Sequence, residues 1–264
     1  MSHPHLIKYY GAAQRGKDVF IVTEYLEGGS LAGVLAAGAP LLPWSLLVAL
    51  GRAAAEGLAH LHAAELLHRD IKTENLLLAD DWRLVVADYG FAKKVADLNG
   101  GVRTAMTILG TEDFMAPEVT FGEAYGVGAD VFSLGCVLVE LLTRQPPGAV
   151  LQRTPRNKFA ANIEALRAAV PADAPPSFVE CAVQCLAYEP EARVSADVVA
   201  DWLRELETEV TALELATPEA EPPVRLKRAG VGAPSAIAAR ATGGEGGAHA
   251  GNVGGDAGQV AVSH

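Results

Sequence analysis

Three short polar motifs follow one another along the middle of the chain. The run HRDIKTEN occupies residues 68–75, Asp-Tyr-Gly occupies residues 88–90, and Ala-Pro-Glu occupies residues 116–118. Their carboxylate and amide oxygens are ligands that Mg2+ prefers, and a lysine ammonium lies two residues after an aspartate. One such triplet would be weak evidence, but three in this order and spacing are very unlikely to arise by chance. The alternative is a helix end followed by a charged turn, which leaves the other two motifs as coincidences.

The order H-R-D-x-K-x-x-N, D-[F/Y]-G, A-P-E resembles the catalytic half of a eukaryotic protein kinase. The resemblance implies that Asp70 orients the substrate hydroxyl and accepts its proton. It also implies that Asn75 and Asp88 bind Mg2+, and that Lys72 places its ammonium near the transferring phosphate. A lysine at this position is typical of kinases that act on Ser and Thr. ATP, Mg2+ and a protein substrate are therefore the expected ligands, and the oligomeric state stays open.

Structural roles follow from the same resemblance. Asp130 is expected to accept hydrogen bonds from the backbone of the catalytic loop. Glu118 is expected to form a buried ion pair with Arg193, which lies in the run EPEAR at 189–193. Tyr89 replaces the usual Phe of the second motif, and its ring is expected to stack on His68.

Residues 91–111 correspond by resemblance to the activation segment. Arg69 would pair with a phosphate carried by this segment, with Thr107 as the first candidate for phosphorylation and Thr104 as the second. These two threonines are alternatively exposed loop residues that are never modified. Thr111 matches the family threonine that hydrogen-bonds near the catalytic aspartate. The runs GTEDFMAPEV and EYLEGGSL are similar to the tyrosine-kinase-like group, including its LIM-kinase-like members.

Upstream of the motifs, residues 6–10 and 19–25 are predicted to be strands of a hairpin, with a polar turn at 14–18. By resemblance they are the last two strands of the small lobe, followed by the hinge. That assignment places five residues around ATP: Thr23 as the gatekeeper, the backbone of Glu24 and Leu26 on adenine, Ser30 near the ribose, and Leu77 under the ring. A plain hairpin with a Gly-rich turn is the alternative.

Apolar periodicity predicts the elements that must position the motifs. Helices are expected over 43–62, 129–143, 177–188 and 195–206, and short strands over 76–78 and 84–87. The helix over 129–143 is apolar on nearly every side, which is typical of a buried central helix. Residues 146–175 are expected to be looser. Cys136, Cys181 and Cys185 are expected to pack in the core, since no further metal ligands accompany them. His60 and His62 are expected to be structural.

Composition narrows the function classes. The chain has 264 residues and a net charge of −11, which argues against a nucleic-acid-binding surface and against anionic membranes. No apolar run reaches the roughly 18 residues that span a bilayer, and no signal sequence begins the chain. The three cysteines show no disulfide spacing, which suits a reducing compartment. A cytoplasmic protein is therefore expected.

These observations predict an α+β, protein-kinase-like fold with a mainly helical large lobe, a hinge and a remnant β-hairpin of the small lobe. The predicted parts are a partial small lobe at 1–25, hinge and large lobe at 26–210, and a disordered Pro/Gly/Ala-rich tail at 211–264. The hairpin is expected to be poorly stable because isolated hairpins are marginal in water. A Gly-rich loop and a strand lysine are absent, which suggests an N-terminally truncated kinase. A non-catalytic, kinase-like (pseudokinase) interaction module is the alternative.

Overall fold

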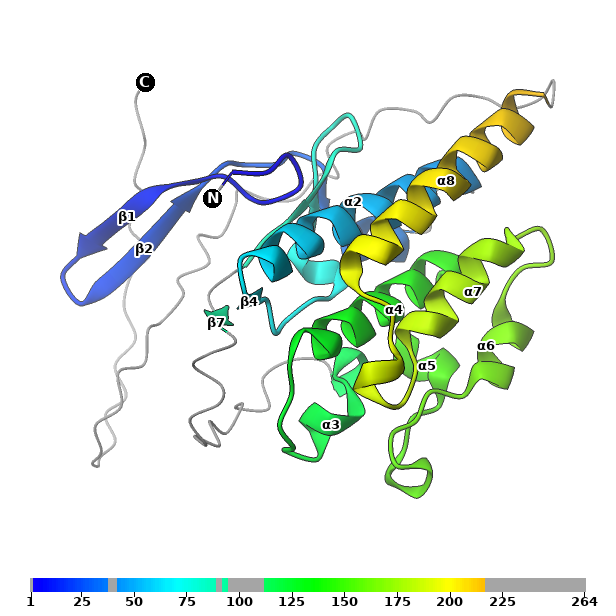
Figure 1. Ribbon diagram of the computed structural model, residues 1–264. Helices are drawn as coiled ribbons and strands as arrows, with labels where there is room; N and C mark the ends of the chain where they lie inside the picture. The colour runs from blue at the N-terminus through cyan, green and yellow to red at the C-terminus, as the bar shows by residue number, and fades with distance from the viewer. Residues whose placement is uncertain (1, 38–41, 89–91, 95–111, 217–264) are drawn as a thin grey trace.

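The computed structural model describes residues 2–37, 42–88, 92–94 and 112–216 (Figure 1). A β-hairpin lies at the edge of a mainly helical body, and helices and small sheets are not arranged in alternation along the chain. This mixed arrangement is the predicted α+β class. Among the described helices, none combines the length and the apolar character that a bilayer span requires.

Four long helices form the body. They are α2 (Trp44–Ala63), α4 (Val127–Thr143), α7 (Pro176–Cys185) and α8 (Ala196–Leu215). Helix α8 runs along α2, and α7 packs on α4 (Figure 1). In α4 nearly every side chain is buried, as the all-round apolar sequence predicts.

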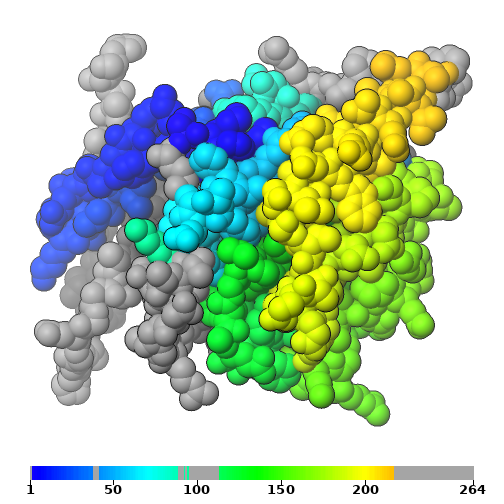
Figure 2. Space-filling model, in the orientation of Figure 1, coloured from blue at the N-terminus to red at the C-terminus, as the bar shows by residue number. Residues whose placement is uncertain are grey.

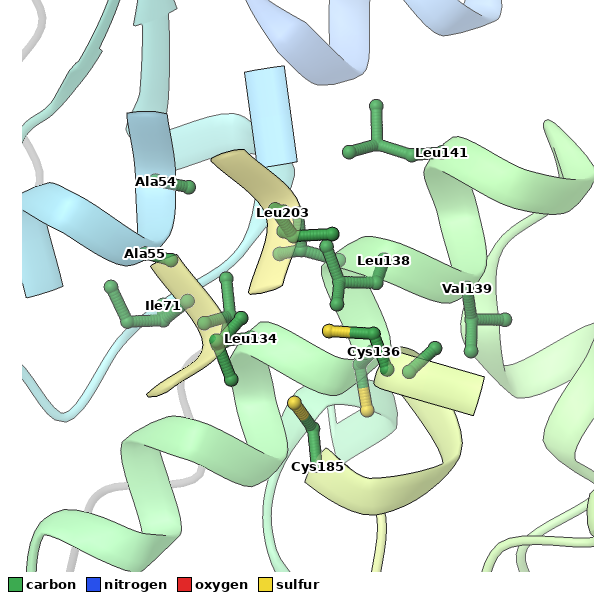
Figure 3. Packing of buried hydrophobic residues seen from close by; sticks show 14 of the residues in the cluster. Ala54, Ala55, Ile71, Leu134, Cys136, Leu138, Val139, Leu141, Cys185 and Leu203 are labelled. Carbon is green, nitrogen blue, oxygen red and sulfur yellow. The ribbon is translucent and has the colours of Figure 1, made fainter. Parts of the chain in front are cut away.

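The centre of the core lies where α2, α4, α7 and α8 meet. Leu138 of α4 and Leu203 of α8 lie beside the α2 backbone, and Cys136 and Cys185 lie in the same cluster (Figure 3). A Cβ at Gly51 of α2 would come within 2.9 Å of Leu138 and 3.3 Å of Leu203. The glycine therefore allows three helices to approach closely. All three cysteines are buried and free, as predicted.

Short antiparallel sheets flank the central loop. Strands β3 (Gly29–Ser30), β5 (Leu76–Leu78) and β6 (Leu84–Val86) form one sheet in that spatial order. Strands β4 (Leu66–Leu67) and β7 (Lys93–Lys94) form another. The loop 68–75 leaves β4 and enters β5, and a 3-10 turn, η1 (Thr73–Asn75), closes it. The predicted strand pair 76–78 and 84–87 is confirmed almost to the residue.

Shorter helices occupy the remaining connections. They are α1 (Leu31–Ala36), α3 (Pro117–Thr120), α5 (Pro147–Leu151) and α6 (Ile163–Ala169), together with the 3-10 turns η4 (Glu112–Phe114), η5 (Pro155–Asn157) and η6 (Pro190–Ala192). The prediction of a loose region over 146–175 is therefore wrong in part. Helices α5 and α6 are stabilised there by burial of Val150, Leu151 and Leu166 rather than by a long apolar stripe.

The hairpin starts later than predicted. Its strands are β1 (Tyr9–Arg15) and β2 (Asp18–Thr23), and their large apolar side chains are mostly exposed, with Tyr10 at 60%. Leu6 and Ile7 are instead buried in the body, where the Ile7 N–H donates to the Val86 carbonyl at 2.9 Å. The hairpin itself lies at one edge of the body (Figure 2).

The last helix is longer than predicted. It extends to Leu215, past the expected end at 206, because its polar second half meets α2. Arg52 pairs with Glu207 at 2.5 Å, and Glu214 accepts a hydrogen bond from the Ser45 N–H at 3.1 Å. Pro43, the N-cap of α2, makes no side-chain cap bond, so Glu214 places a carboxylate at this helix N-terminus.

Candidate active site

The loop 68–75 is anchored to α4 by one buried carboxylate. Asp130 accepts hydrogen bonds from the His68 and Arg69 N–H groups, each at 2.8 Å. It also lies 3.0 Å from His62 Nε2 on α2. Burial alone would raise the pKa of Asp130, yet the His62 hydrogen bond, nearby histidine charge and the Arg69 N–H together hold the pKa below 3.8. Asp130 therefore stays ionised and fixes the start of the loop.

Two non-glycine residues at the site have a left-handed backbone. Arg69 has a φ of 72° and Asp88 has a φ of 63°. Each such conformation costs of order 1–3 kcal/mol and persists only where the surroundings hold it. For Arg69 the bond from its N–H to Asp130 is one such constraint.

Three predicted residues meet around one carboxylate. Lys72 Nζ lies 2.9 Å from Asp70 Oδ1 and 2.8 Å from Asp70 Oδ2. Asn75 Nδ2 donates to Asp70 Oδ2 and to the Asp70 carbonyl, both at 2.8 Å. The η1 turn places Asn75 back over Asp70, since the Asn75 N–H donates to the Lys72 carbonyl at 3.0 Å. A carboxylate held by an ammonium and an amide can accept a proton from an approaching hydroxyl in a fixed direction.

The far side of the loop is held by a second α4 carboxylate. Thr73 is buried, and its hydroxyl donates to Glu140 Oε2 at 2.9 Å. Burial raises the pKa of Glu140, and the charge of Glu74 raises it further. The sequence gives no prediction for the Glu140 contact and predicts only a structural role for His62. A polar residue inside an otherwise apolar helix was the available signal for Glu140.

Asp88 is brought to the loop by β6. The Ala87 N–H donates to the Asn75 carbonyl at 2.9 Å, and His68 Nε2 lies 2.9 Å from the Ala87 carbonyl. Asp88 follows directly and is exposed. Its carboxylate and the Asn75 amide oxygen give a hard-oxygen donor pair, which suits Mg2+ completed by phosphate oxygens and water. Among the described residues, no group of three His, Cys, Asp or Glu side chains is placed to hold a metal without such outside ligands.

The residues expected around ATP lie at the end of β2, in the connection that follows it, and on β3 and β5. Leu26 is buried in a small apolar cluster with Ile7, Val85 and Ala87, and Leu77 packs against it. Thr23 ends β2, and its hydroxyl donates to the Glu24 carbonyl at 3.2 Å. Ser30 caps α1 by accepting from the Gly33 N–H at 3.2 Å.

Glu24 ties the hairpin base to the body. Its N–H donates to the Lys8 carbonyl at 2.9 Å, and its carboxylate accepts from the Lys8 N–H at 2.9 Å and pairs with Arg83 at 3.2 Å. Glu24 is therefore connected to Arg83, which directly precedes β6, the strand whose other end leads to Asp88.

Glu118 of α3 and Arg193 form a buried bidentate pair, with N–O distances of 2.7 and 2.9 Å. Arg193 also donates to the carbonyls of Ala187, Tyr188 and Gly128. Four predicted residues, Tyr89, Thr104, Thr107 and Thr111, lie outside the described part of the chain.

Comparison with known proteins agrees with this geometry. Residues 1–202 match the family described as the protein kinase domain. One probable serine/threonine-protein kinase of Dictyostelium discoideum is 37% identical over 204 residues, which cover 77% of this chain and 47% of that protein. A second from the same organism is 33% identical over 261 residues, covering 85% of this chain and 33% of the relative. A third is 37% identical over 196 residues, which cover 74% of this chain and 21% of the relative.

The chain thus spans about half or less of the length of these relatives. The family match, in contrast, covers most of the chain and includes all three motifs. By its sequence, its α+β fold and its anchored polar loop, the chain belongs to the protein kinase domain family.

Proposed function

We propose that the site transfers the γ-phosphate of ATP to Ser or Thr hydroxyls of proteins. The observation that carries the proposal is the Asp70–Lys72–Asn75 arrangement, held at 2.8–2.9 Å on a loop that Asp130 anchors. With Asp88 as the fourth, the polar residues of the catalytic half are retained together. This retention favours catalysis over a purely non-catalytic module. Assignment to the tyrosine-kinase-like, LIM-kinase-like group stays a prediction.

In this proposal Asp70 accepts the proton as the acceptor oxygen bonds to the γ-phosphorus and the bond to the β-phosphate oxygen breaks. ADP leaves with the electron pair of that broken bond. Lys72 holds the Asp70 carboxylate and offsets charge on the phosphoryl oxygens. Asn75 and Asp88 would hold Mg2+, which supplies neutralisation of phosphate charge when bound. Leu77, which is partly buried and packs on the cluster that contains Leu26, would lie under the adenine ring, and the Leu26 backbone would hydrogen-bond adenine.

The test is transfer of labelled phosphate from MgATP to a degenerate Ser/Thr peptide library. Asp70→Asn keeps the size of the side chain but removes the proton acceptor, so the rate is expected to fall by about 10²–10⁴-fold. Asp201→Asn makes the same chemical change on the exposed surface of α8 and serves as the matched control. Equal rates for wild type and Asp70→Asn, or no transfer by the wild type, would overturn the proposal.

A further inference from the structure

The N-terminal segment, residues 3–7, meets α2 at a group of three histidines. His3 and His5 come from the segment, and His60 comes from α2. The rings of His3 and His60 are stacked, with centroids 4.8 Å apart and planes inclined by 23°. The His5 ring lies 5.8 Å from the His3 ring, and all three side chains are partly buried. Three groups that gain a proton near neutral pH therefore share one contact.

The hydrogen bond that His3 makes requires its neutral form. The His5 N–H donates to His3 Nδ1 at 3.3 Å, so this nitrogen presents a lone pair and carries no proton. An imidazolium carries a proton on both ring nitrogens. Protonation of His3 would therefore break this hydrogen bond and place a cation against the His60 ring. Burial lowers the pKa of His3 below its ordinary 6.5, and the charges of His60 and His5 lower this pKa further.

The carboxylate nearest to this contact is already balanced by other cations. Glu56 lies 3.3 Å from His5 Nε2, but it also pairs with Arg52 at 2.8 Å and with Arg204 at 2.9 Å. The charge of Glu56 raises the pKa of His3, yet the net direction of the shift is downward. Glu56 therefore offsets only part of the cost of a proton on His3.

The other groups around the contact are mainly basic. They come from the segment itself, from α2, from the connection before β6, where the Arg83 side chain donates to the Pro4 carbonyl at 3.4 Å, and from α8. The titratable and charged side chains among them are His5, Arg52, Glu56, His60, Arg83 and Arg204. All of them except Glu56 are basic, so a positive charge on His3 would add to charge of the same sign.

The same contact determines how firmly the hairpin base is held. The Ile7 N–H donates to the Val86 carbonyl, and the Val86 N–H donates to the His5 carbonyl, both at 2.9 Å. The Ile7 side chain is buried in the small apolar cluster that contains Leu26. Lys8, the next residue, is bonded to Glu24 at the base of the hairpin. Detachment of residues 3–7 would therefore loosen the hairpin base as well.

We propose that His3 is a proton-sensitive anchor: its neutral form holds residues 3–7 and the hairpin base on α2 and β6, and its protonated form releases them. The detached segment takes up the proton more readily than the attached one. Attachment should therefore be complete above the ordinary pKa near 6.5 and weaken as the pH falls below it. The inference does not depend on the proposed phosphoryl transfer.

The experiment measures amide exchange of the full chain by NMR between pH 7.5 and 5.5. The protection factor of the Ile7 N–H, corrected for the intrinsic exchange rate at each pH, is divided by that of Val139 in α4, which removes any change in global stability. This ratio is expected to fall by about threefold or more on acidification, and by at most about tenfold per pH unit, because detachment takes up one proton. A ratio that stays constant, or that rises because the His5–Glu56 pair dominates, would overturn the inference.

His3→Asn tests the role of the proton directly. Asparagine keeps an oxygen that can accept the N–H two residues further on, but it cannot be protonated in this range. The ratio should then change by less than about twofold, whereas Ser2→Asn, at the exposed neighbouring position, should keep the wild-type profile. An undiminished fall in His3→Asn would overturn the inference. If His3→Asn fails to fold, titration of the His3 ring in the wild type decides the question, because a midpoint at or above pH 6.5 would also overturn it.

Discussion

Glu118 and Arg193 face each other through two parallel hydrogen bonds in the interior, although 75 positions separate them in sequence. Each is less than a tenth exposed. The pair joins α3 to the connection before α8. Arg193 also donates to main-chain carbonyls. Removing either residue of the pair would therefore leave a buried polar group without its hydrogen-bond partner.

Arg193→Met should therefore be strongly destabilising. It leaves the Glu118 carboxylate buried without its cation, and the free energy of unfolding is expected to fall by about 3–5 kcal/mol in urea titrations. Arg167→Met removes one partner of the exposed Arg167–Glu180 pair at 3.0 Å and should cost less than about 1 kcal/mol. Similar decreases in the free energy of unfolding for the two variants would contradict the burial of the Glu118–Arg193 pair.

Asp130 gives the fold a defined acid sensitivity. Its pKa is lower in the folded protein than the ordinary 3.8, so the unfolded state binds the proton more readily. The stability it contributes is present above about pH 4 and is lost as the pH falls through the lower, folded-state pKa. At pH 7, Asp130→Asn is expected to lose about 1.5–3 kcal/mol, the value of a hydrogen bond to a charged group.

Urea unfolding of wild type and Asp130→Asn along a pH series checks this. The difference between the two proteins should shrink as the pH falls below 4. Asp201→Asn, on the exposed face of α8, should show little difference from wild type at any pH. If the difference in unfolding free energy between Asp130→Asn and wild type does not change with pH, the charge of the Asp130 carboxylate does not contribute to stability.

Glu140 should have the opposite pH dependence. Burial raises its pKa in the folded state, so the folded protein binds the proton more readily and loses stability as the pH rises through that window. Gln at position 140 can still accept the Thr73 hydrogen bond but carries no charge. Glu140→Gln should therefore be at least as stable as wild type at pH 7, and this advantage should vanish below the unfolded pKa near 4.5. A large loss of stability at pH 7 would contradict this account.

Gly57 sets how closely the N-terminal segment approaches α2. A Cβ at this position would come within 2.6 Å of the His5 carbonyl and 2.9 Å of Val86 Cγ2. Gly57→Ala should cost about 1–3 kcal/mol through overpacking. Gly33→Ala, in the exposed part of α1, meets only Ser30 Oγ at 3.3 Å and should be neutral or slightly stabilising. Equal thermal midpoints for both variants would show that the segment moves aside without cost.

Amide exchange should divide the N-terminal region at Lys8. The Ile7 N–H is buried and bonded to Val86, so it should exchange with the protection of the core. Residues 10–22 lie on an exposed two-stranded hairpin and should exchange rapidly through local opening. Slow exchange throughout the hairpin would contradict this prediction. Mass spectrometry of deuterated peptides provides the measurement.

The long helices could be predicted from the sequence because one physical signal dominates them. The apolar stripe of α2 and the uniformly apolar α4 predict both helices to within two residues of their ends. The end of α8 could not be predicted this way. Its last turns bury little apolar surface and depend on Glu207 and Glu214 meeting α2, which is a property of the folded arrangement.

Contacts made only in the folded state also decide the position of Leu6 and Ile7. The apolar run that contains them predicts a strand, but both side chains are buried against the body and the strand begins at Tyr9. At the site, local motifs identified Asp70, Lys72 and Asn75, because these lie within one loop. The sequence gives no role to Glu140, because Glu140 itself lies outside the motifs and its partner Thr73 is distant in sequence.

The anchoring of the catalytic loop on α4 has a consequence for how the molecule can move. Asp130 and Glu140 attach both ends of the loop to the most deeply buried helix. The loop that holds Asp70 is therefore an integral part of the rigid core, whereas the contacts that the described residues of the hairpin make with that core lie at the base of the hairpin. If the proposed function is right, opening and closing around a nucleotide is movement of the hairpin side relative to a stationary loop.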